Sequence, residues 1–541
     1  MSVRKAIVLL LALSTIVFLA ACGGSSKINP VPPPTGGFSD SNLNGTYVFS
    51  VSGTDESGSG AAYSMVGTLT ANGSGGITGG TLDINDNNTA EFTSGPVVGA
   101  TINGGGSYNV SVDGRGQATF GINVSGFPKI TLDFVLSSDS QGLVTEFDTF
   151  GTGSGTLDAQ TASVTPTGPY AFSLSGATYS GSAFAAVGNF TLGSGGAINP
   201  GSGFADFNNG ALTISTAQAL TGAVIPVSST PSTLSTQQYP SLAFDVYPID
   251  NTHLKFVETD TNGTLSGDAY SQTTTAIPAE TLAFTIAGDF PSGTPFAGGG
   301  FMVTDGAGNI TDSSSEDFNG GGTLSPTTPV TFTGNYVVDA NDAGRYTLTT
   351  ASGFSGGTTF AAYPSSGGLL LLEIDPAGVG ITVGAGYPTT AGATFAAAEG
   401  YGLNLTGVNL SAPAEVDDIA EFTANSTGAT VTGLIDENSS EEIITFDTQL
   451  SGTYGAPSGG RGTISATAGT NSSNSTLNTG FGLIFYTVDG ITFPFMEYDS
   501  GQVATGVFVQ QAATSSSAVA HQHMFVMHPP FHPNTARGKK Q

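Results

Sequence analysis

The chain has 541 residues, of which 41 are acidic and 11 basic, so its formal net charge is −30 at pH 7. Such an acidic chain is a poor partner for nucleic acid and for anionic lipid surfaces. Only 10% of the residues are charged and 38% are hydrophobic, which excludes a disordered polyelectrolyte. The length exceeds what one hydrophobic core supports, so several domains are expected.

The N-terminal end has the pattern of an export signal. Arg4 and Lys5 precede an apolar run at 6–19, and the sequence Leu-Ala-Ala-Cys occupies 19–22. This pattern predicts a signal peptide at 1–21 rather than a retained membrane-spanning helix. Residues 19–22 resemble a bacterial lipobox, and the resemblance implies that Cys22 becomes the N-terminus and carries diacylglyceryl and an acyl chain such as palmitate. The alternative is an ordinary secretory signal with an incidental cysteine.

The mature chain is expected to be anchored by lipid alone. More than one acyl chain gives stable anchoring, and no second apolar stretch approaches the ~18 residues of a spanning helix. Residue 23 is glycine, where aspartate would signal inner-membrane retention, so the resemblance implies the outer membrane in a Gram-negative cell. Residues 22–40 are rich in proline, glycine and serine and are predicted to form a tether. Without a second cysteine, the exported body must be held by its cores.

Self-comparison identifies four copies of one unit. Each copy opens with an alternating apolar and polar segment that ends at glycine, and an Asp-x-Asn element follows 29 or 30 residues after that glycine. Joints containing threonine or proline separate the copies. The predicted domains are β repeats at 41–160, 167–272, 281–388 and 395–511, followed by a linker and tail at 512–541.

The predicted fold class is all-β, with one small antiparallel up-and-down barrel in each repeat. Each copy has about eight short alternating runs, broken by Gly-rich or Asn/Asp-Gly turns. A barrel is favoured over the alternative, a β-sandwich, because closure removes the sheet edges. The arrangement resembles uncharacterised glycine-rich β-repeat lipoproteins of acidobacterial type and, more distantly, the barrel lobes of surface receptor lipoproteins. Neither resemblance implies a functional residue.

All four copies carry a Glu-x-Asp pair in a predicted strand, and three carry a Gly-Arg element. The candidate residues are Glu146, Asp148, Glu258, Asp260, Glu373, Asp375, Glu497 and Asp499, with Arg115, Arg345 and Arg461. A buried carboxylate needs a cation or several donors. We therefore expect each arginine to bind the Glu-x-Asp pair of its own copy. The second copy lacks the arginine, and Gln237, Gln238 or Lys255 is expected to replace it.

Catalysis is disfavoured. Two carboxylates could act as acid and base, as in glycosidases, but enzymes seldom repeat an active site in tandem. The chain also has no tryptophan to stack on a sugar. A Ser-His-Asp arrangement fails because the body holds one histidine, His253, which is better explained as a satisfied strand residue.

Two metal sites are considered. The Asp-x-Asn elements could bind calcium through oxygen ligands, although Asx-turn capping explains them without an ion. The tail could bind copper or nickel, because it combines imidazole and thioether groups; a short biased tail without a metal is the alternative. Its candidate ligands are His521, His523, Met524, Met527, His528 and His532.

The function expected from the sequence is that of a lipid-anchored cell-envelope protein with a structural, adhesive or surface-interaction role and no catalytic activity. Its four barrels are expected to form a semi-flexible rod, and its partners to be membrane lipid and an unidentified protein or small molecule. The alternative is a lipoprotein that binds a small ligand or a transition metal, and a carboxylate-based hydrolase is third. Barrel interiors filled by side chains favour the first function, whereas an open lumen of several hundred Å³ favours a receptor.

Overall fold

The computed structural model divides the chain into two units, Met1–Pro32 and Pro33–Gln541, and all the elements below belong to the second. The described residues are 37–512, except 57–59, 89–94, 126, 162–164, 211–213, 228–230, 291, 352–353, 356, 376–379, 398, 412–413, 440–444 and 469–480. The signal peptide, Cys22, most of the tether and the His/Met tail lie outside them. No helix among the described residues has the length and hydropathy needed to cross a bilayer.

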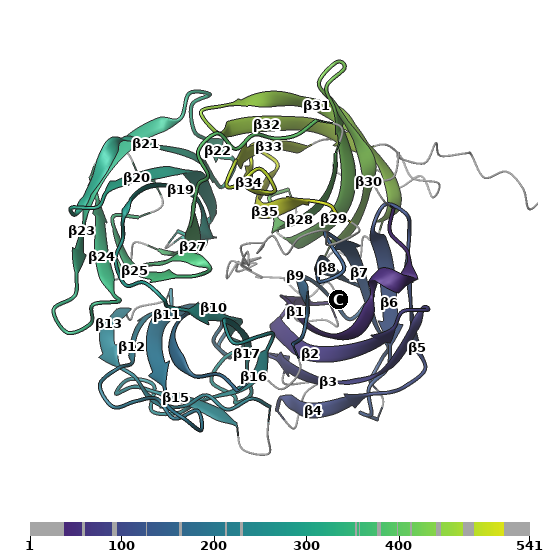
Figure 1. Cartoon of the computed structure of the whole chain (residues 1–541), viewed down its shortest axis with the longest axis horizontal. Helices are drawn as coiled ribbons and strands as arrows, with labels where there is room; N and C mark the ends of the chain where they lie inside the picture. Colours follow the sequence, from purple (N-terminus) through teal and green to yellow (C-terminus); the bar gives the residue numbers. More distant parts are fainter. Residues whose placement is uncertain are drawn as a thin grey trace, which may run out of the picture. The chain divides into compact units, whose positions relative to one another are not determined.

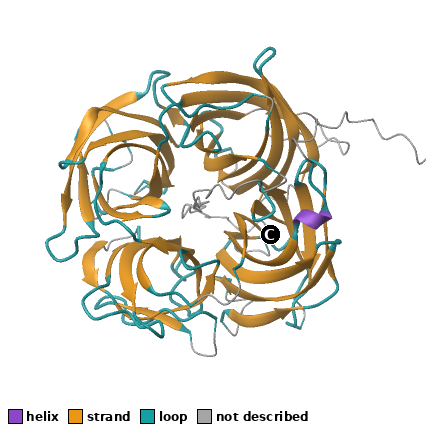
Figure 2. Ribbon diagram, in the orientation of Figure 1, coloured by secondary structure: helices purple, strands orange, loops and turns teal. Residues whose placement is uncertain are grey.

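The fold is all-β and contains four antiparallel barrels in tandem, as predicted; one short 3-10 helix, η1 (Asp40–Asn42), precedes them (Figures 1 and 2). Barrel 1 comprises β1 (Asn44–Asp55), β2 (Ala62–Asn72), β3 (Gly76–Asp86), β4 (Val97–Ile102), β5 (Gly106–Val110), β6 (Arg115–Phe120), β7 (Ile130–Leu136), β8 (Gln141–Phe147) and β9 (Gly151–Ala159). Barrel 2 comprises β10 (Gly168–Ala177), β11 (Ala183–Leu192), β12 (Phe204–Asn208), β13 (Ile214–Ala219), β14 (Thr221–Ala223), β15 (Ser232–Ser235), β16 (Leu242–Pro248), β17 (His253–Glu258) and β18 (Ser266–Ser271).

The remaining strands form the other two barrels. Barrel 3 comprises β19 (Ala279–Asp289), β20 (Pro295–Asp305), β21 (Asn309–Gly320), β22 (Thr323–Leu324), β23 (Val330–Val338), β24 (Tyr346–Thr350), β25 (Thr359–Ser365), β26 (Gly368–Glu373) and β27 (Ile381–Pro388). Barrel 4 comprises β28 (Gly400–Asn409), β29 (Ala414–Asn425), β30 (Thr430–Ser439), β31 (Thr445–Ser458), β32 (Arg461–Ala468), β33 (Phe481–Tyr486), β34 (Thr492–Glu497) and β35 (Gln502–Gln510).

The barrels share one topology, in which strands pair in chain order and the last strand returns to the first; β4 and β22 depart from this order and pair only with β3 and β21. Barrel 4 closes fully from β28 to β35. In barrels 1 and 3 the pairs β2–β3 and β20–β21 close the sheet. In barrel 2, β13 pairs with β12 and β14 pairs with β15, and only Leu220 separates these two segments. Barrel 2 is therefore nearly closed, with an interrupted strand in the place that β31 fills in barrel 4.

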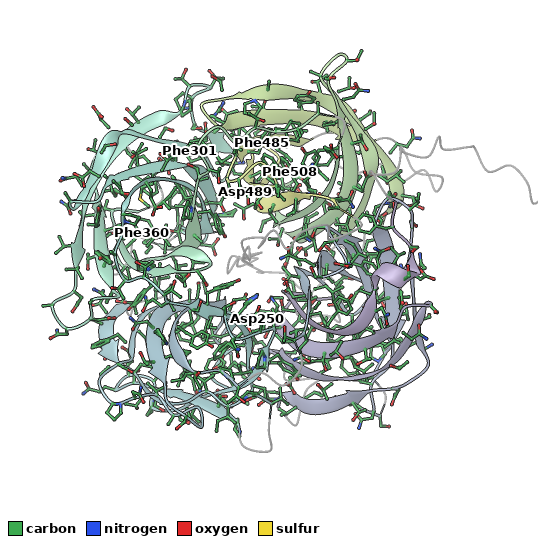
Figure 3. All side chains as sticks on the ribbon, viewed as in Figure 1. Asp250, Phe301, Phe360, Phe485, Asp489 and Phe508 are labelled. Atoms are coloured by element: carbon green, nitrogen blue, oxygen red, sulfur yellow. The ribbon has the colours of Figure 1, made fainter. Side chains whose placement is uncertain are left out.

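Aromatic and aliphatic side chains fill the barrel interiors. In barrel 1, the rings of Phe49 and Phe120 lie 5.9 Å apart between centroids. In barrel 4, Phe508 stacks on Phe493 at 4.8 Å and meets Phe485 edge-on at 5.2 Å; Figure 3 labels Phe485 and Phe508 in this barrel. Such close aromatic packing leaves no broad lumen at these levels.

The outer faces of the barrels are also partly buried, because the barrels pack on one another. A separate apolar cluster contains side chains from all four barrels, among them Leu143, Tyr270, Leu370 and Met496. Every residue of β26, including four consecutive leucines, is buried, as expected of a strand covered on both faces.

The predicted semi-flexible rod is wrong. A rod has contacts only between successive barrels, but barrel 4 also contacts barrel 1: Thr152 and Ser154 each donate a hydrogen bond of 2.7 Å to Asp417. Contacts therefore run from barrel 1 to 2, 2 to 3, 3 to 4 and 4 back to 1. Buried polar and apolar groups lie at these interfaces, and interfaces of this kind restrict motion between domains.

Candidate functional site: the interfaces between barrels

The asparagine of each Asp-x-Asn element joins its barrel to the next one. The Asn208 amide, at the end of β12, donates to the carbonyls of Glu373 at 2.9 Å and Gly380 at 3.0 Å in barrel 3. The equivalent pairs are Asn85 with Glu258 and Gly263, Asn319 with Glu497 and Gln502, and Asn438 with Glu146 and Gly151. Each asparagine thus bridges the turn between the last two strands of the neighbouring barrel, and barrel 4 does so to barrel 1. We call this arrangement the asparagine clamp.

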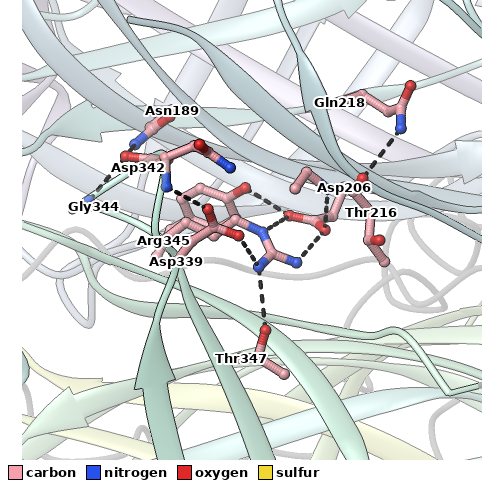
Figure 4. Close-up of polar contacts among 12 residues, drawn as sticks. Asn189, Asp206, Thr216, Gln218, Asp339, Asp342, Gly344, Arg345 and Thr347 are labelled. Carbon is pink, nitrogen blue, oxygen red and sulfur yellow. Dashed lines mark hydrogen bonds and ion pairs between the residues drawn. The ribbon is translucent and has the colours of Figure 1, made fainter.

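The aspartate of the same element binds the arginine of the next barrel. Arg345 Nε and Nη2 donate to both carboxylate oxygens of Asp206 at 2.8 and 2.7 Å (Figure 4). Arg461 makes the same bidentate contact with Asp317, at 2.8 Å for each bond. Paired hydrogen bonds of this kind fix orientation as well as charge.

The other two interfaces depart from this pattern. Arg115 reaches Asp436 by one bond of 3.2 Å and is shared with Asp113 and Asp447. At the first interface there is no repeat arginine, and Asp83 instead accepts a hydrogen bond from the Tyr247 hydroxyl.

A tyrosine of the next barrel supplements the clamp in three interfaces. Tyr363 donates to Asp206 at 2.6 Å and Tyr486 donates to Asp317 at 2.9 Å, as Tyr247 does to Asp83. In barrel 1, Val135 occupies this place: it pairs with Arg115 as Tyr486 pairs with Arg461.

The predicted pairing of each arginine with its own Glu-x-Asp pair is therefore wrong. The arginines do form ion pairs, but with the preceding barrel in the cycle. The aspartates of the pairs are instead satisfied by their own turns: Asp148 accepts from the Thr131 and Phe150 amides at 2.6 and 2.8 Å. Asp260, Asp375 and Asp499 likewise accept backbone amides of their own barrels.

The glutamates of the pairs are buried acids. Their side chains accept bonds from the Tyr63 hydroxyl, the Leu265 amide and the Thr382 hydroxyl in barrels 1, 2 and 3. Burial raises the pKa of Glu373 to about 8. In Glu146, Glu258 and Glu497, burial and then the aspartate two residues on raise the pKa well above the usual range. These shifts favour the neutral form of each carboxyl group, and a neutral carboxyl group needs no arginine.

Lys255 is an interface cation of barrel 2, but it does not bind Glu258 or Asp260. Its Nζ lies 3.1 Å from Asp268 and 3.5 Å from Asp158 of barrel 1. Burial alone would lower the pKa of Lys255, but Asp268 and Asp158 raise it. His253 is a buried strand residue whose Nε2 lies 2.6 Å from Asp268. The other two proposed substitutes, Gln237 and Gln238, are exposed in the loop before β16.

The contact between barrels 4 and 1, which we call the seam, gathers carboxyl groups around Arg115. Burial raises the pKa of Asp133 to about 8, of Glu421 to about 9 and of Asp436 to about 6. The seam therefore holds several carboxyl groups that take up protons near neutral pH and a single arginine that is not bidentate to any of them.

Metal binding stays a prediction. The Asp-x-Asn aspartates face arginine or tyrosine, and Asn208 and Asn319 accept the amides of Gly210 and Gly322 in the manner of Asx turns. Within the described part of the chain, no group of three or more His, Cys, Asp or Glu side chains is placed to hold a metal ion. The tail residues lie outside it.

Barrel 3 contains a small apolar cavity. It has a volume of about 20 Å³ and is lined mainly by aromatic and aliphatic side chains, among them Phe284, Met302, Phe332 and Phe354. This volume suits about one water molecule. It is far below the several hundred Å³ expected of a site for a small organic ligand.

Sequence reasoning missed the direction of the contacts and the role of the asparagine amide. One signal was available. The run of four leucines in β26 is apolar without alternation, and such runs indicate strands buried on both faces. It pointed to packing between barrels, which is where the recurring charges lie.

No protein-family model and no curated protein matches the chain. Among solved structures, it is similar to the isotype 1 transferrin binding protein B (TbpB) from serogroup B Neisseria meningitidis. The identity is 10%, the match covers 69% of this chain and 84% of that chain, and the TM-score is 0.18. At this score the two chains do not superpose as whole molecules.

Proposed function

We propose that this chain is a lipid-anchored cell-envelope protein whose four barrels form one rigid, non-catalytic body with a structural or surface-interaction role. One observation carries the proposal: the recurring polar residues are used in contacts between or within barrels. The asparagine clamp and the Asp–Arg pairs join barrels, and the glutamates are only 0–2% exposed. A carboxyl group this inaccessible does not meet a substrate, and this weighs against the hypothesis of a carboxylate-based hydrolase.

The filled barrel interiors support the same proposal. Phenylalanine and tyrosine rings pack across the lumens, and the cavity in barrel 3 has room for about one water molecule. Recognition would then occur on the outer surface. There, side chains are carried by strands that the interfaces hold in place, so a partner meets a preformed surface. Anchoring through Cys22 would place this body at the envelope.

The anchor is tested by metabolic labelling with radioactive palmitate, followed by membrane fractionation and protease treatment of intact cells. We expect the wild-type chain to be labelled and membrane-bound, and Cys22→Ser to be unlabelled and released from the membrane. An unlabelled wild-type chain would contradict the anchor.

The surface role is tested by native mass spectrometry of the acylated protein taken from its own envelope. A macromolecular partner, retained under gentle activation, is the expected result. A bound small organic molecule in place of a macromolecule would favour the ligand-binding alternative.

A further inference from the structure

The first interface holds a buried cluster that the asparagine clamp does not use. Lys255, in β17, directs its Nζ across the interface to barrel 1, where Thr156 Oγ1 lies at 2.7 Å and Asp158 Oδ2 at 3.5 Å. Asp268 of barrel 2 lies on the other side, at 3.1 Å. The side chains of Lys255 and Asp158 are 2% and 5% exposed. An ammonium group and a carboxylate group are thus held together with little access to water.

We propose that Lys255 and Asp158 condense into an isopeptide bond that ties barrel 1 covalently to barrel 2. The Lys255 ammonium first gives a proton to Asp268, a transfer that the ion pair opposes because it raises the pKa of Lys255 and lowers the pKa of Asp268. The free amine attacks Asp158 Cγ, and the Nζ–Cγ bond forms as one carboxyl oxygen departs. That oxygen leaves as water, with the proton held by Asp268 and a second proton from the nitrogen. No oxidant, reductant or further reactant is needed. Asp268 gains one proton and then loses it, so its charge is the same before and after the reaction.

Geometry supports the meeting of the two groups. Lys255 Nζ lies 3.5 Å from Asp158 Oδ2, and groups held close together in a fixed orientation react far faster than free groups in solution. Lysine is an effective nucleophile once it loses its proton in a desolvated site with a base within hydrogen-bond reach. Asp268 lies at that distance, and its Oδ1 is also 2.6 Å from His253 Nε2, which provides a second place for the proton.

The surroundings also favour the product. Lys255 and Asp158 are charged groups removed from water, and burying such charges is costly. Condensation converts both into one neutral amide and releases a water molecule from a nearly dry site. This interface is also the one whose second barrel lacks the repeat arginine, so a covalent tie would lie where the Asp–Arg pair is missing.

Between Asp158 and Asp268, the structure favours Asp158 as the acyl partner. Asp268 Oδ1 already contacts both Lys255 and His253, and Asp268 faces Lys255 in the register of β17 and β18. It is therefore placed to exchange protons with the amine. Asp158 is bound by Lys255, Thr156 and Gln141, and it lies on the neighbouring barrel.

Trypsin and mass spectrometry test the bond in the full mature chain. Lys255 is the only trypsin site between Lys129 and Arg345. In the denatured protein, we expect no cleavage after Lys255 and a peptide 130–345 that is lighter by one water. A second protease should place the link between the segments that contain Asp158 and Lys255. Cleavage after Lys255 with unmodified masses, or a link to Asp268, would overturn the proposal.

Three variants sharpen the result. Asp158→Asn should still form the link, but with loss of ammonia in place of water, a signature that a noncovalent ion pair cannot give. Asp268→Asn should fold and keep the full mass, because the proton acceptor is gone. Lys129→Arg, at an exposed cation, is the matched control and should keep the link. Circular dichroism verifies folding of each variant, and a folded Asp158→Asn chain of full mass contradicts the proposal.

Discussion

The bidentate contact between Arg345 and Asp206 is the most buried ion pair of the repeat, with side chains 4% and 0% exposed. Removing the arginine leaves a carboxylate between two barrels with only Tyr363 and the Ala217 amide to bind it. Breaking one side of a buried pair costs about 3–5 kcal/mol. We expect Arg345→Ala to lower the free energy of unfolding by that amount in urea denaturation.

The matched control for this prediction is Lys129→Ala, because Lys129 is an exposed cation. Its effect should stay within about 0.5 kcal/mol. If the two variants lost equal stability, the Asp206–Arg345 pair would not be a structural element of the interface.

At the scale of elements, glycine allows one strand to approach the neighbouring barrel. A Cβ atom added to Gly299, in β20, would lie 2.5 Å from Tyr486 Cε2 of barrel 4. Tyr486 is fully buried and its hydroxyl binds Asp317 at 2.9 Å, so the ring cannot move aside. Overpacking of this kind costs about 1–3 kcal/mol.

We therefore expect Gly299→Ala to lower the midpoint of urea unfolding. Gly121→Ala is the control, since a Cβ there would have only an ordinary contact of 3.8 Å with Asn103. Equal midpoints for the two variants would mean that barrels 3 and 4 are not packed at Tyr486.

The strands and the barrel closure were predictable because alternation and turn residues are local. The pairing of the charges was not. Repetition shows that Asp206, Asp317 and the arginines recur. Every repeat contains the same kinds of acidic residue, so the sequence does not show which repeat supplies the partner of each arginine. Arg345 is 139 residues from Asp206, and no pattern within a copy distinguishes that aspartate from Asp317. Only the burial of both faces, visible in the four leucines of β26, indicated that the barrels meet.

For the whole molecule, the raised carboxyl pKa values predict a stability that falls as pH rises. Asp133, Glu421 and Asp436 have folded pKa values of about 8, 9 and 6, above their ordinary values of 3.8, 4.5 and 3.8. The folded chain therefore holds protons that the unfolded chain has already released. This contribution is complete below about pH 4 and is lost as pH rises to about 9.

Urea unfolding at pH 5 and pH 9 checks this prediction, with the higher midpoint expected at pH 5. Asp133→Asn should lose less stability over the same interval, because the amide still accepts the 2.8 Å bond from Gln117 and cannot ionise. Asp312→Asn, at an exposed carboxylate, should follow the wild-type curve. A wild-type chain equally stable at both pH values would refute the assignment of protonated carboxyl groups to the interfaces.

The seam should be the first of the four interfaces to open. The other three join barrels that are consecutive in the chain, whereas barrels 4 and 1 are linked by no short peptide. The seam also has Val135 where three interfaces have a tyrosine, and Arg115 binds three aspartates by single bonds in place of one bidentate contact.

In Arg115→Gln, hydrogen exchange should therefore accelerate in β6 and β30. It should not accelerate in β12 and β25, which meet at the second interface through Asp206 and Tyr363. Arg345→Gln should give the reverse pattern, since exchange reports local opening where contacts are weakened. Uniform acceleration across all four barrels in either variant would mean that the interfaces open together, and that the cycle has no weakest contact.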